Sequence, residues 1–268
     1  MRSSGLEAKI GIALLLVLIL IALFAPLIAP GDPLAISGEA MLRPFASEAH
    51  LLGTDRLGRD VLAGLVHGTR TTLLVAFFSA AAALVVGSAV GTISGFLGGF
   101  ADTVLMRITE AFQTVPGFLL ALAAVSVTGP SVPTLIFAIS LGNWTQAARV
   151  TRAEVLSLRE RDFVAAARTM GMRPLEIAFR EILPNAFGPT ASLAAISVAT
   201  AILIEAALSF LGFGDPNRVT WGSMIAEGRT VLRAAPYLSI IPGIALVVTV
   251  LSVHLIGRGL SRTQRLQS

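Results

Sequence analysis

The stretch Arg161–Pro184, RDFVAAARTMGMRPLEIAFREILP, is an arginine-rich island between segments apolar enough to cross a bilayer. Helix-forming residues run from Asp162 to Met170, and Gly171 ends this run, because glycine is the usual residue just past a helix end. Pro174 can open a second helix, since proline is tolerated in a first turn. The stretch therefore predicts two short helices at a sharp angle. They form a knob at the membrane surface that suits docking by a partner protein.

The composition of the whole chain excludes an ordinary soluble domain. Of the 268 residues, 54% are hydrophobic and only 13% are charged, whereas a soluble domain carries roughly 25% charged residues. The mean hydropathy is +0.81. The chain has no cysteine, which removes disulfides, zinc–thiolate sites and thiol nucleophiles from consideration. We therefore predict an all-α membrane protein that crosses the bilayer several times.

Six apolar segments are long enough to span the hydrocarbon core, which takes about 20 residues. They are Ile10–Ala29, Leu73–Leu97, Ala111–Thr128, Val132–Arg149, Thr190–Leu211 and Tyr237–Gly257. The first is interpreted as a retained helix, because it exceeds the roughly 7–15 apolar residues of a signal peptide and has no clear small-x-small cleavage site. The polar segment Gly31–Arg70 is expected to be a loop outside the membrane, with a short amphipathic stretch near Val61–His67.

Basic residues decide the orientation of these spans, because they accumulate in cytoplasmic loops. With the N-terminus inside, 13 of the 20 basic residues fall on inner segments and 7 on outer loops. This distribution predicts that both termini, the knob and the basic tail Arg258–Ser268 are cytoplasmic, with loops 31–70 and 212–236 outside. Arg149, Arg152 and Arg159 are interpreted as residues that merely set this topology.

Glycines recur at four-residue spacing in the second span. Gly87, Gly91 and Gly95, with Gly99 just beyond, lie on one helix face. Such a stripe lets another backbone approach closely, which is how helices associate in lipid. Packing within one subunit is preferred here over an interface with a second subunit.

No motif in the sequence predicts a catalytic or metal site. A P-loop needs a lysine that reaches the phosphates, and the single lysine, Lys9, lies outside any glycine-rich loop. There is no HExxH motif. Of the three histidines, His50 and His67 are expected on the outer loop and His254 near the inner end of the last span. The chain is therefore not a P-loop ATPase.

Glu205 is the one carboxylate well inside an expected span. An ionised group in hydrocarbon costs at least about 2.5–3.5 kcal/mol, so it must face protein or water. At about 1.5 Å per residue, Asn143 in the fourth span lies at a comparable depth. The two side chains are expected to be hydrogen-bond partners. They form either a structural polar contact between helices or part of a translocation path.

Four charged residues of the outer loop, Asp55, Arg56, Arg59 and Asp60, follow one another closely. We expect them to form a local ion-pair cluster that folds the loop, in preference to contacting a substrate.

Three blocks carry a resemblance to a known family. His50–Arg70, HLLGTDRLGRDVLAGLVHGTR, resembles an LGTDxLGRD block before the second span. The knob is similar to a cytoplasmic EAA loop, with an EAA-three-residues-Gly register and a Leu-Pro ending. Glu205–Gly214, EAALSFLGFG, is followed by Trp221-Gly222. With these blocks in this order, the chain resembles the C-type inner-membrane permeases of the ATP-binding-cassette importers for dipeptides, oligopeptides and nickel.

The chain also departs from this family's pattern. Aligned on Gly171, the usual glutamate of the EAA loop falls on Ala165, and the isoleucine position of its ending reads Glu181. The tail reads Gly257-Arg258-Gly259-Leu260-Ser261-Arg262 where the family often has an acidic pattern. These differences are interpreted as variation at partner surfaces.

The resemblance implies the type I importer permease fold, with six transmembrane helices and a cytoplasmic coupling helix in the loop at about 160–184. Residues 1–72 would form the N-terminal helix and outer loop, and residues 73–268 the permease domain. Two ATPase subunits would hold ATP and Mg²⁺ and push on the knob, so the chain itself is not an enzyme and binds no cofactor. The expected ATPase contacts are Ala165, Ala166, Ala167, Arg168, Gly171, Met172, Arg173, Pro174 and Leu175.

The resemblance also implies a location and further partners. The chain would be a multi-pass protein of the bacterial inner (cytoplasmic) membrane, paired with a homologous B-type permease. An extracytoplasmic binding protein would deliver substrate onto the outer loops. Dipeptides or oligopeptides are the preferred substrates, with chelated nickel and peptide-like conjugates left open. No nucleic acid is expected as a partner.

Two other classes of function are weighed against this one. A secondary transporter usually needs ion-coupling residues near the midplane, often with inverted repeats, and the chain offers one intramembrane carboxylate and no convincing repeat. A membrane scaffold without transport is disfavoured, because the knob has the register of an ATPase-docking loop. Co-purification of two ATPases and ATP-dependent uptake would separate the three.

Overall fold

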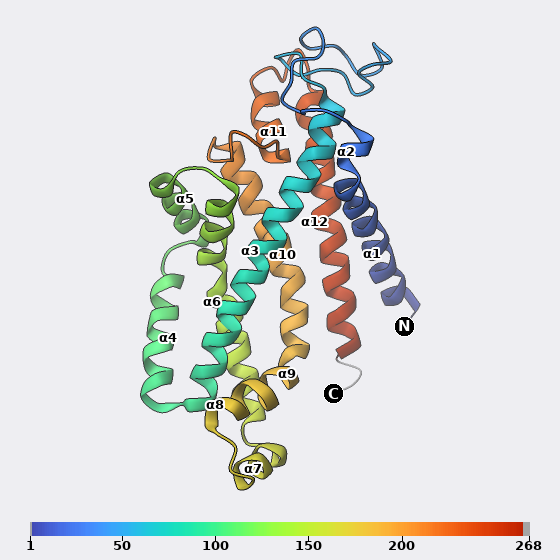
Figure 1. Cartoon of the computed structure of the whole chain (residues 1–268). Coiled ribbons are helices and arrows are strands. Elements are labelled where there is room, and N and C mark those ends of the chain that lie inside the picture. The colour runs from blue at the N-terminus through green and yellow to red at the C-terminus, as the bar shows by residue number, and fades with distance from the viewer. Residues whose placement is uncertain (1, 265–268) are drawn as a thin grey trace.

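The computed structural model describes residues 2–264, with the side chains of 6–186 and 193–259. Within them the chain is a bundle of helices without a named strand (Figure 1). The helices are α1 (Arg2–Leu23), α2 (Ala25–Ile28), α3 (Val61–Leu97), α4 (Gly99–Gln113), α5 (Gly117–Thr128), α6 (Val132–Leu158), α7 (Asp162–Thr169), α8 (Pro174–Glu176), the π-helical η1 (Ile177–Ile182), α9 (Leu183–Asn185), α10 (Phe187–Phe210), α11 (Trp221–Arg229) and α12 (Tyr237–Gln264). Residues 265–268 of the expected basic tail lie outside the described residues.

Four of the described helices are long and apolar enough to cross a membrane alone: α1, α3, α10 and α12. The expected span Val132–Arg149 is part of α6, whose 27 residues extend about 40 Å at 1.5 Å per residue. This helix is less apolar than the other four, because the polar residues Asn143 and Gln146 interrupt its apolar sequence. Helix α6 packs against α3, α5 and α10, and Asn143 is half-buried, whereas Gln146 is exposed.

The third expected span, Ala111–Thr128, is wrong as a single helix. The structure divides this region into α4 and α5, which meet at an angle of 82° across a three-residue break. Pro116 stands at the break with an extended ψ of 130°. Proline lacks the amide hydrogen of a helix interior and disfavours a helical residue before it. Taken together, α4 and α5 are at most one broken span, which would be the fifth by length and composition.

The second expected span begins too late. Helix α3 starts at Val61, so the segment expected as the end of a loop forms its first turns. The Asp60 carboxylate fixes this start by accepting hydrogen bonds from the amides of Leu62 (2.7 Å) and Ala63 (3.1 Å). With 37 residues, α3 is about 55 Å long and extends beyond a hydrocarbon core of about 30 Å. The division between residues 72 and 73 therefore falls inside one helix.

The glycine stripe of α3 faces α6 of the same chain. A Cβ on Gly87 would lie 2.3 Å from the Trp144 carbonyl oxygen, and one on Gly91 would lie 2.3 Å from that of Ala148. At Gly95 the nearest atoms, at 3.0 Å, belong to Arg152 and Val155. The two helices therefore meet backbone to backbone along this seam, as small residues permit.

The bundle has two distinct ends (Figure 1). The knob formed by α7 and α8 projects from one end, and α11 lies at the other with the loop between α2 and α3. Helices α1 and α12 lie side by side, and α1 begins and α12 ends toward the knob. The two ends carry the candidate functional residues.

Candidate functional site

The knob contains the two short helices that its sequence predicts. Helix α7 ends at Thr169, and Gly171 follows with φ +78°, a conformation that favours glycine. A second helical segment opens at Pro174 and continues through η1 and α9 to Asn185. The Leu183-Pro184 ending therefore lies inside this segment, where the π-helical η1 passes into α9.

The knob is packed firmly against the ends of two long helices. Its own buried residues contact Phe96 at the end of α3 and Val155 near the end of α6. Those knob residues are Val164, Ala167, Ile177, Ala178, Ile182 and Ala186. One apolar cluster therefore joins the knob to the ends of α3 and α6.

Most, but not all, of the expected ATPase contacts lie on the surface of the knob. Ala167 is buried and Met172 is half-buried against the same core. In α7 the inward face carries Val164 and, three residues on, Ala167. The exposed members of the set are Ala165, Ala166, Arg168, Gly171, Arg173, Pro174 and Leu175.

Part of the knob surface is apolar, and of its residues the sequence analysis predicted only Leu175 as a contact and missed Met170, Phe163 and Phe179. Met170, at the turn, is 74% exposed, and Leu175 beside it is 52% exposed. Phe163 and Phe179 are partly exposed as well. The signal was available, because four large apolar residues stand in a polar island. Exposed apolar groups clustered at a projecting tip indicate an interaction surface.

Three arginines assigned only to topology have structural partners. Arg152 binds both carboxylate oxygens of Asp102, each at 2.6 Å. Arg159 donates to the Gly95 carbonyl oxygen at 3.0 Å, and Arg149 donates to the Gln113 side chain at 3.1 Å. Each contact joins α6, or the residue that ends it, to α3 or α4. In the knob, Arg168 lies over the Phe96 ring, 5.7 Å from its centroid, in a cation–π contact.

At the other end of the bundle, Glu205 and Asn143 are not hydrogen-bonded to each other. Glu205 is fully buried, and its Oε1 accepts a hydrogen bond from Ser209 Oγ at 2.7 Å. The hydroxyls of Thr72 and Thr220 face the same carboxyl. The Asn143 amide nitrogen is buried with no hydrogen-bond partner among the described residues. The pairing prediction is therefore wrong, because hydroxyls from α3, α10 and the start of α11 surround Glu205 instead.

Near Glu205, contacts of Trp221 and Gly222 hold α11 in place. The Trp221 ring is fully buried and donates from Nε1 to the Leu65 carbonyl oxygen at 3.1 Å. Its backbone amide donates to Thr72 Oγ1 at 3.4 Å. Gly222 allows this approach, since a Cβ there would lie 2.5 Å from the Ala206 carbonyl oxygen. These contacts place α11 against α3 and α10.

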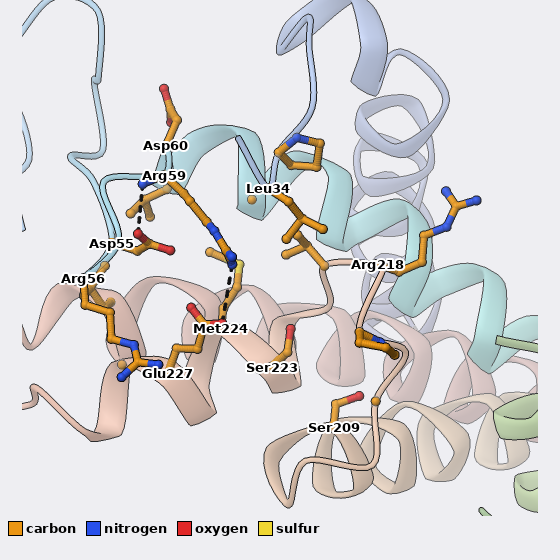
Figure 2. A pocket seen from close by; sticks show the side chains of 18 of the residues that line it. Leu34, Asp55, Arg56, Arg59, Asp60, Ser209, Arg218, Ser223, Met224 and Glu227 are labelled. Atoms are coloured by element: carbon orange, nitrogen blue, oxygen red, sulfur yellow. Dashed lines mark hydrogen bonds and ion pairs between the residues drawn. The ribbon is translucent and has the colours of Figure 1, made fainter. Parts of the chain in front are cut away.

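The charged cluster of the outer loop is organised differently from the expected set of local ion pairs. Asp55 Oδ1 accepts from the amides of Leu57 (2.7 Å) and Arg59 (2.9 Å). Asp60 caps α3 and contacts His50 Nδ1 at 3.0 Å. Arg59 reaches across to Glu227 of α11 at 3.7 Å (Figure 2). The carboxylates thus fold the loop through backbone amides, and the one arginine ion pair links the loop to a different helix.

The loop is also held by Tyr237, at the start of α12. Its hydroxyl lies 2.6 Å from the Leu42 carbonyl oxygen and 3.0 Å from that of Thr54. Tyr237→Phe keeps the ring and removes this donor. The loss should lower the free energy of opening the loop by ~1 kcal/mol. Trypsin should therefore cleave after the exposed Arg56 about fivefold faster. Cleavage after Arg168, at the opposite end, is the internal control, and an unchanged rate at Arg56 would contradict the contact.

The comparisons with known proteins agree with one another. Residues 87–266 match the sequence profile of the family described as binding-protein-dependent transport system inner membrane component. The dipeptide transport system permease protein DppC of Alkalihalophilus pseudofirmus is 37% identical over 254 residues, covering 94% of this chain and 83% of that protein. The probable peptide ABC transporter permease protein y4tQ of Sinorhizobium fredii is 42% identical, covering 90% and 82%.

A solved structure shows the same fold at lower sequence identity. The chain superposes on the inward-facing MetNI methionine ABC transporter with a TM-score of 0.61 and 20% identity. The match covers 76% of this chain and 96% of that one. The helical architecture is therefore shared beyond the sequence relatives.

Proposed function

The chain belongs to the family of binding-protein-dependent transport system inner membrane components, and we propose that it is the permease subunit of an ATP-driven importer of di- or oligopeptides. Relatives named for dipeptide, peptide and glutathione transport support a peptide-like substrate. In this role the chain catalyses no reaction. ATP hydrolysis belongs to partner subunits that bind ATP and Mg²⁺.

The proposed assembly has a partner on each face of the membrane. A homologous B-type permease pairs with this chain, two ATPase subunits dock on the knob, and a binding protein delivers peptide at the α11 end. The excess of basic residues on the knob side supports a cytoplasmic knob. Because α1 begins and α12 ends toward the knob (Figure 1), this orientation gives a multi-pass protein of the bacterial inner membrane with both termini in the cytoplasm.

The observation that carries the proposal is the construction of the knob. Its tip presents Met170 and Leu175 beside Arg168 and Arg173, a combination of apolar anchors and guanidiniums suited to docking. Its base is packed on α3 and α6. An ATPase that closes on ATP would therefore displace two long helices through one attachment, which is the mechanical requirement for alternating access.

Two polar residues inside the bundle, Glu205 and Asn143, are the candidates for the translocation path. Glu205 is enclosed within this chain, which supports a structural role for its carboxyl. Asn143 stays the second candidate for the path, because its amide nitrogen, like Oε2 of Glu205, is buried with no hydrogen-bond partner among the described residues. A passing peptide carbonyl would supply the missing acceptor.

The docking proposal is tested by purifying the complex from its native membrane in mild detergent. Ala166→Asp alters an exposed position of α7, so the knob should stay folded while the partner surface gains charge. We expect wild type to retain two ATPases and ATP-stimulated peptide uptake. The variant should retain at least about tenfold less ATPase, because a carboxylate desolvated without a partner costs more than ~1.4 kcal/mol.

Ala46→Asp is the matched control, since Ala46 is an exposed alanine of the outer loop at the opposite end. It should leave ATPase recovery unchanged. Recovery of the protein without any ATPase, or equal recovery of ATPase with Ala166→Asp and with wild type, would overturn the docking proposal.

A further inference from the structure

A pocket of about 220 Å³ lies between the outer loop and α11 (Figure 2). It is built from two of the sequence blocks, the loop residues before α3 and the glycine-rich turn after α10, with α11 as its third wall. Four carboxylates and three guanidiniums line it. They are Asp55, Asp60, Asp215, Glu227, Arg56, Arg59 and Arg218.

Glu227 is the incompletely compensated carboxylate of the pocket, since Asp55, Asp60 and Asp215 each accept hydrogen bonds from backbone amides. Figure 2 shows Asp55, Arg59 and Glu227 pointing toward one another, whereas Arg218 points away. The Arg59–Glu227 contact, at 3.7 Å, is too long for a hydrogen bond. Within the described part of the chain no donor bonds either carboxylate oxygen of Glu227. Burial and the charge of Asp55 raise the pKa of Glu227, and Arg59 and Arg56 oppose this only in part.

Within the described part of the chain, neither Asp55 nor Glu227 accepts a hydrogen bond from a positively charged side chain. An ammonium group supplies three donors and one positive charge, and charge-assisted hydrogen bonds to carboxylates are the stronger kind. A cation between Glu227 and Asp55 would also relieve the repulsion between them.

Apolar side chains also line the pocket, namely Leu34, Val61, Val219, Met224 and Leu238. A volume of about 220 Å³ is smaller than the roughly 300–1,000 Å³ of a site for a drug-sized ligand. It has room for one amino-acid residue and the start of the next, not for a long chain. The amino-terminal residue of a peptide carries an ammonium group next to a side chain and so fits this lining.

We infer that this pocket binds the charged amino terminus of a peptide, with Glu227 and Asp55 accepting from its ammonium group and the apolar wall holding the first side chain. The inference rests on the proposed function for its choice of peptide over other primary amines. It places a first docking position for the substrate on the outer face of this subunit, before the membrane is crossed.

The test is calorimetric titration of the purified full-length protein in lipid nanodiscs with Ala-Ala and with N-acetyl-Ala-Ala. Acetylation removes the positive charge and two of the three donors. We expect binding of Ala-Ala and at least about tenfold weaker binding of the acetylated peptide. Glu227→Gln should weaken Ala-Ala binding by a similar factor, because the amide keeps the shape and loses the charge.

Glu48→Gln is the matched control, since Glu48 is an exposed carboxylate of the same loop outside the pocket lining. It should bind Ala-Ala as wild type does. The two peptides also compare binding on unaltered protein, so the result stands even if Glu227→Gln does not fold. Equal binding of the two peptides, or no binding of Ala-Ala at millimolar concentration, would overturn the inference.

The same preparation separates this inference from the proposed function. Retained ATPases and ATP-driven uptake together with no direct binding of Ala-Ala would reject the pocket and leave the importer intact. Loss of both ATPases from a preparation that still distinguishes the two peptides would reject the docking proposal and leave the ammonium site.

Discussion

Gly91→Ala is expected to remove most of the folded protein from the membrane. The new Cβ would lie 2.3 Å from the Ala148 carbonyl oxygen and 2.9 Å from the Arg152 amide nitrogen. Both atoms belong to the backbone of α6, which cannot turn aside as a flexible side chain can. The helices must separate along a seam that includes Gly87 and Gly95, and overpacking of this kind costs about 3 kcal/mol or more. That is a large fraction of a typical stability of about 5–15 kcal/mol.

Gly243→Ala provides the control for this experiment. Gly243 lies inside α12, and no atom would come within 4 Å of a Cβ there. Alanine should therefore be neutral or slightly stabilising, since it is the better helix former. The thermal melting temperature of the purified protein measures both variants. Equal melting temperatures for Gly91→Ala and Gly243→Ala would show that α3 and α6 do not approach this closely.

The second large effect is expected at the knob end of the bundle. Arg152 and Asp102 form a bidentate pair, and Asp102 also accepts a hydrogen bond from Ser94 near the end of α3. One carboxylate thus joins α3, α4 and α6 beside the attachment of the knob. Arg152→Met leaves this carboxylate partly buried without its counter-charge. Because the two side chains are 32% and 21% exposed, we expect Arg152→Met to lower the free energy of unfolding by ~2 kcal/mol. Breaking a fully buried pair would lower it by ~3–5 kcal/mol.

Three further variants make the Arg152 result specific. Arg107→Met breaks an ion pair with Glu110 whose side chains are 79% and 61% exposed, and exposed pairs contribute little. The double variant Asp102→Asn with Arg152→Met should recover part of the loss, because the uncompensated charge is gone, and Asp102→Asn alone completes the double-mutant cycle. An Arg152→Met protein that melts at the same temperature as Arg107→Met would contradict this account.

Coupling of ATP hydrolysis to uptake, measured on the same proteins, should fall with Arg152→Met, since the knob is packed on α3 and α6.

Local features that depend on one stretch of chain were predictable. Gly171 and Pro174 fix the turn between the knob helices, because one residue requires a left-handed backbone and the other suits a first turn. The bend at Pro116 was equally local, but the continuous apolar run from Ala111 to Thr128 outweighed it. Hydropathy reports how much of a segment avoids water and not whether its backbone stays straight.

The sequence alone determined that this is a membrane protein, which family it resembles and where its knob lies, because hydropathy, glycine and proline act over short distances. Only the tertiary structure decided what touches what. It showed that Ser209, not Asn143, is the hydrogen-bond partner of Glu205, and that Ala167 is buried. It also brought Arg59 to Glu227 and the Trp221 amide to Thr72. Each of these outcomes depends on how helices far apart in the chain rotate and slide against one another, and that is fixed by packing across the whole bundle.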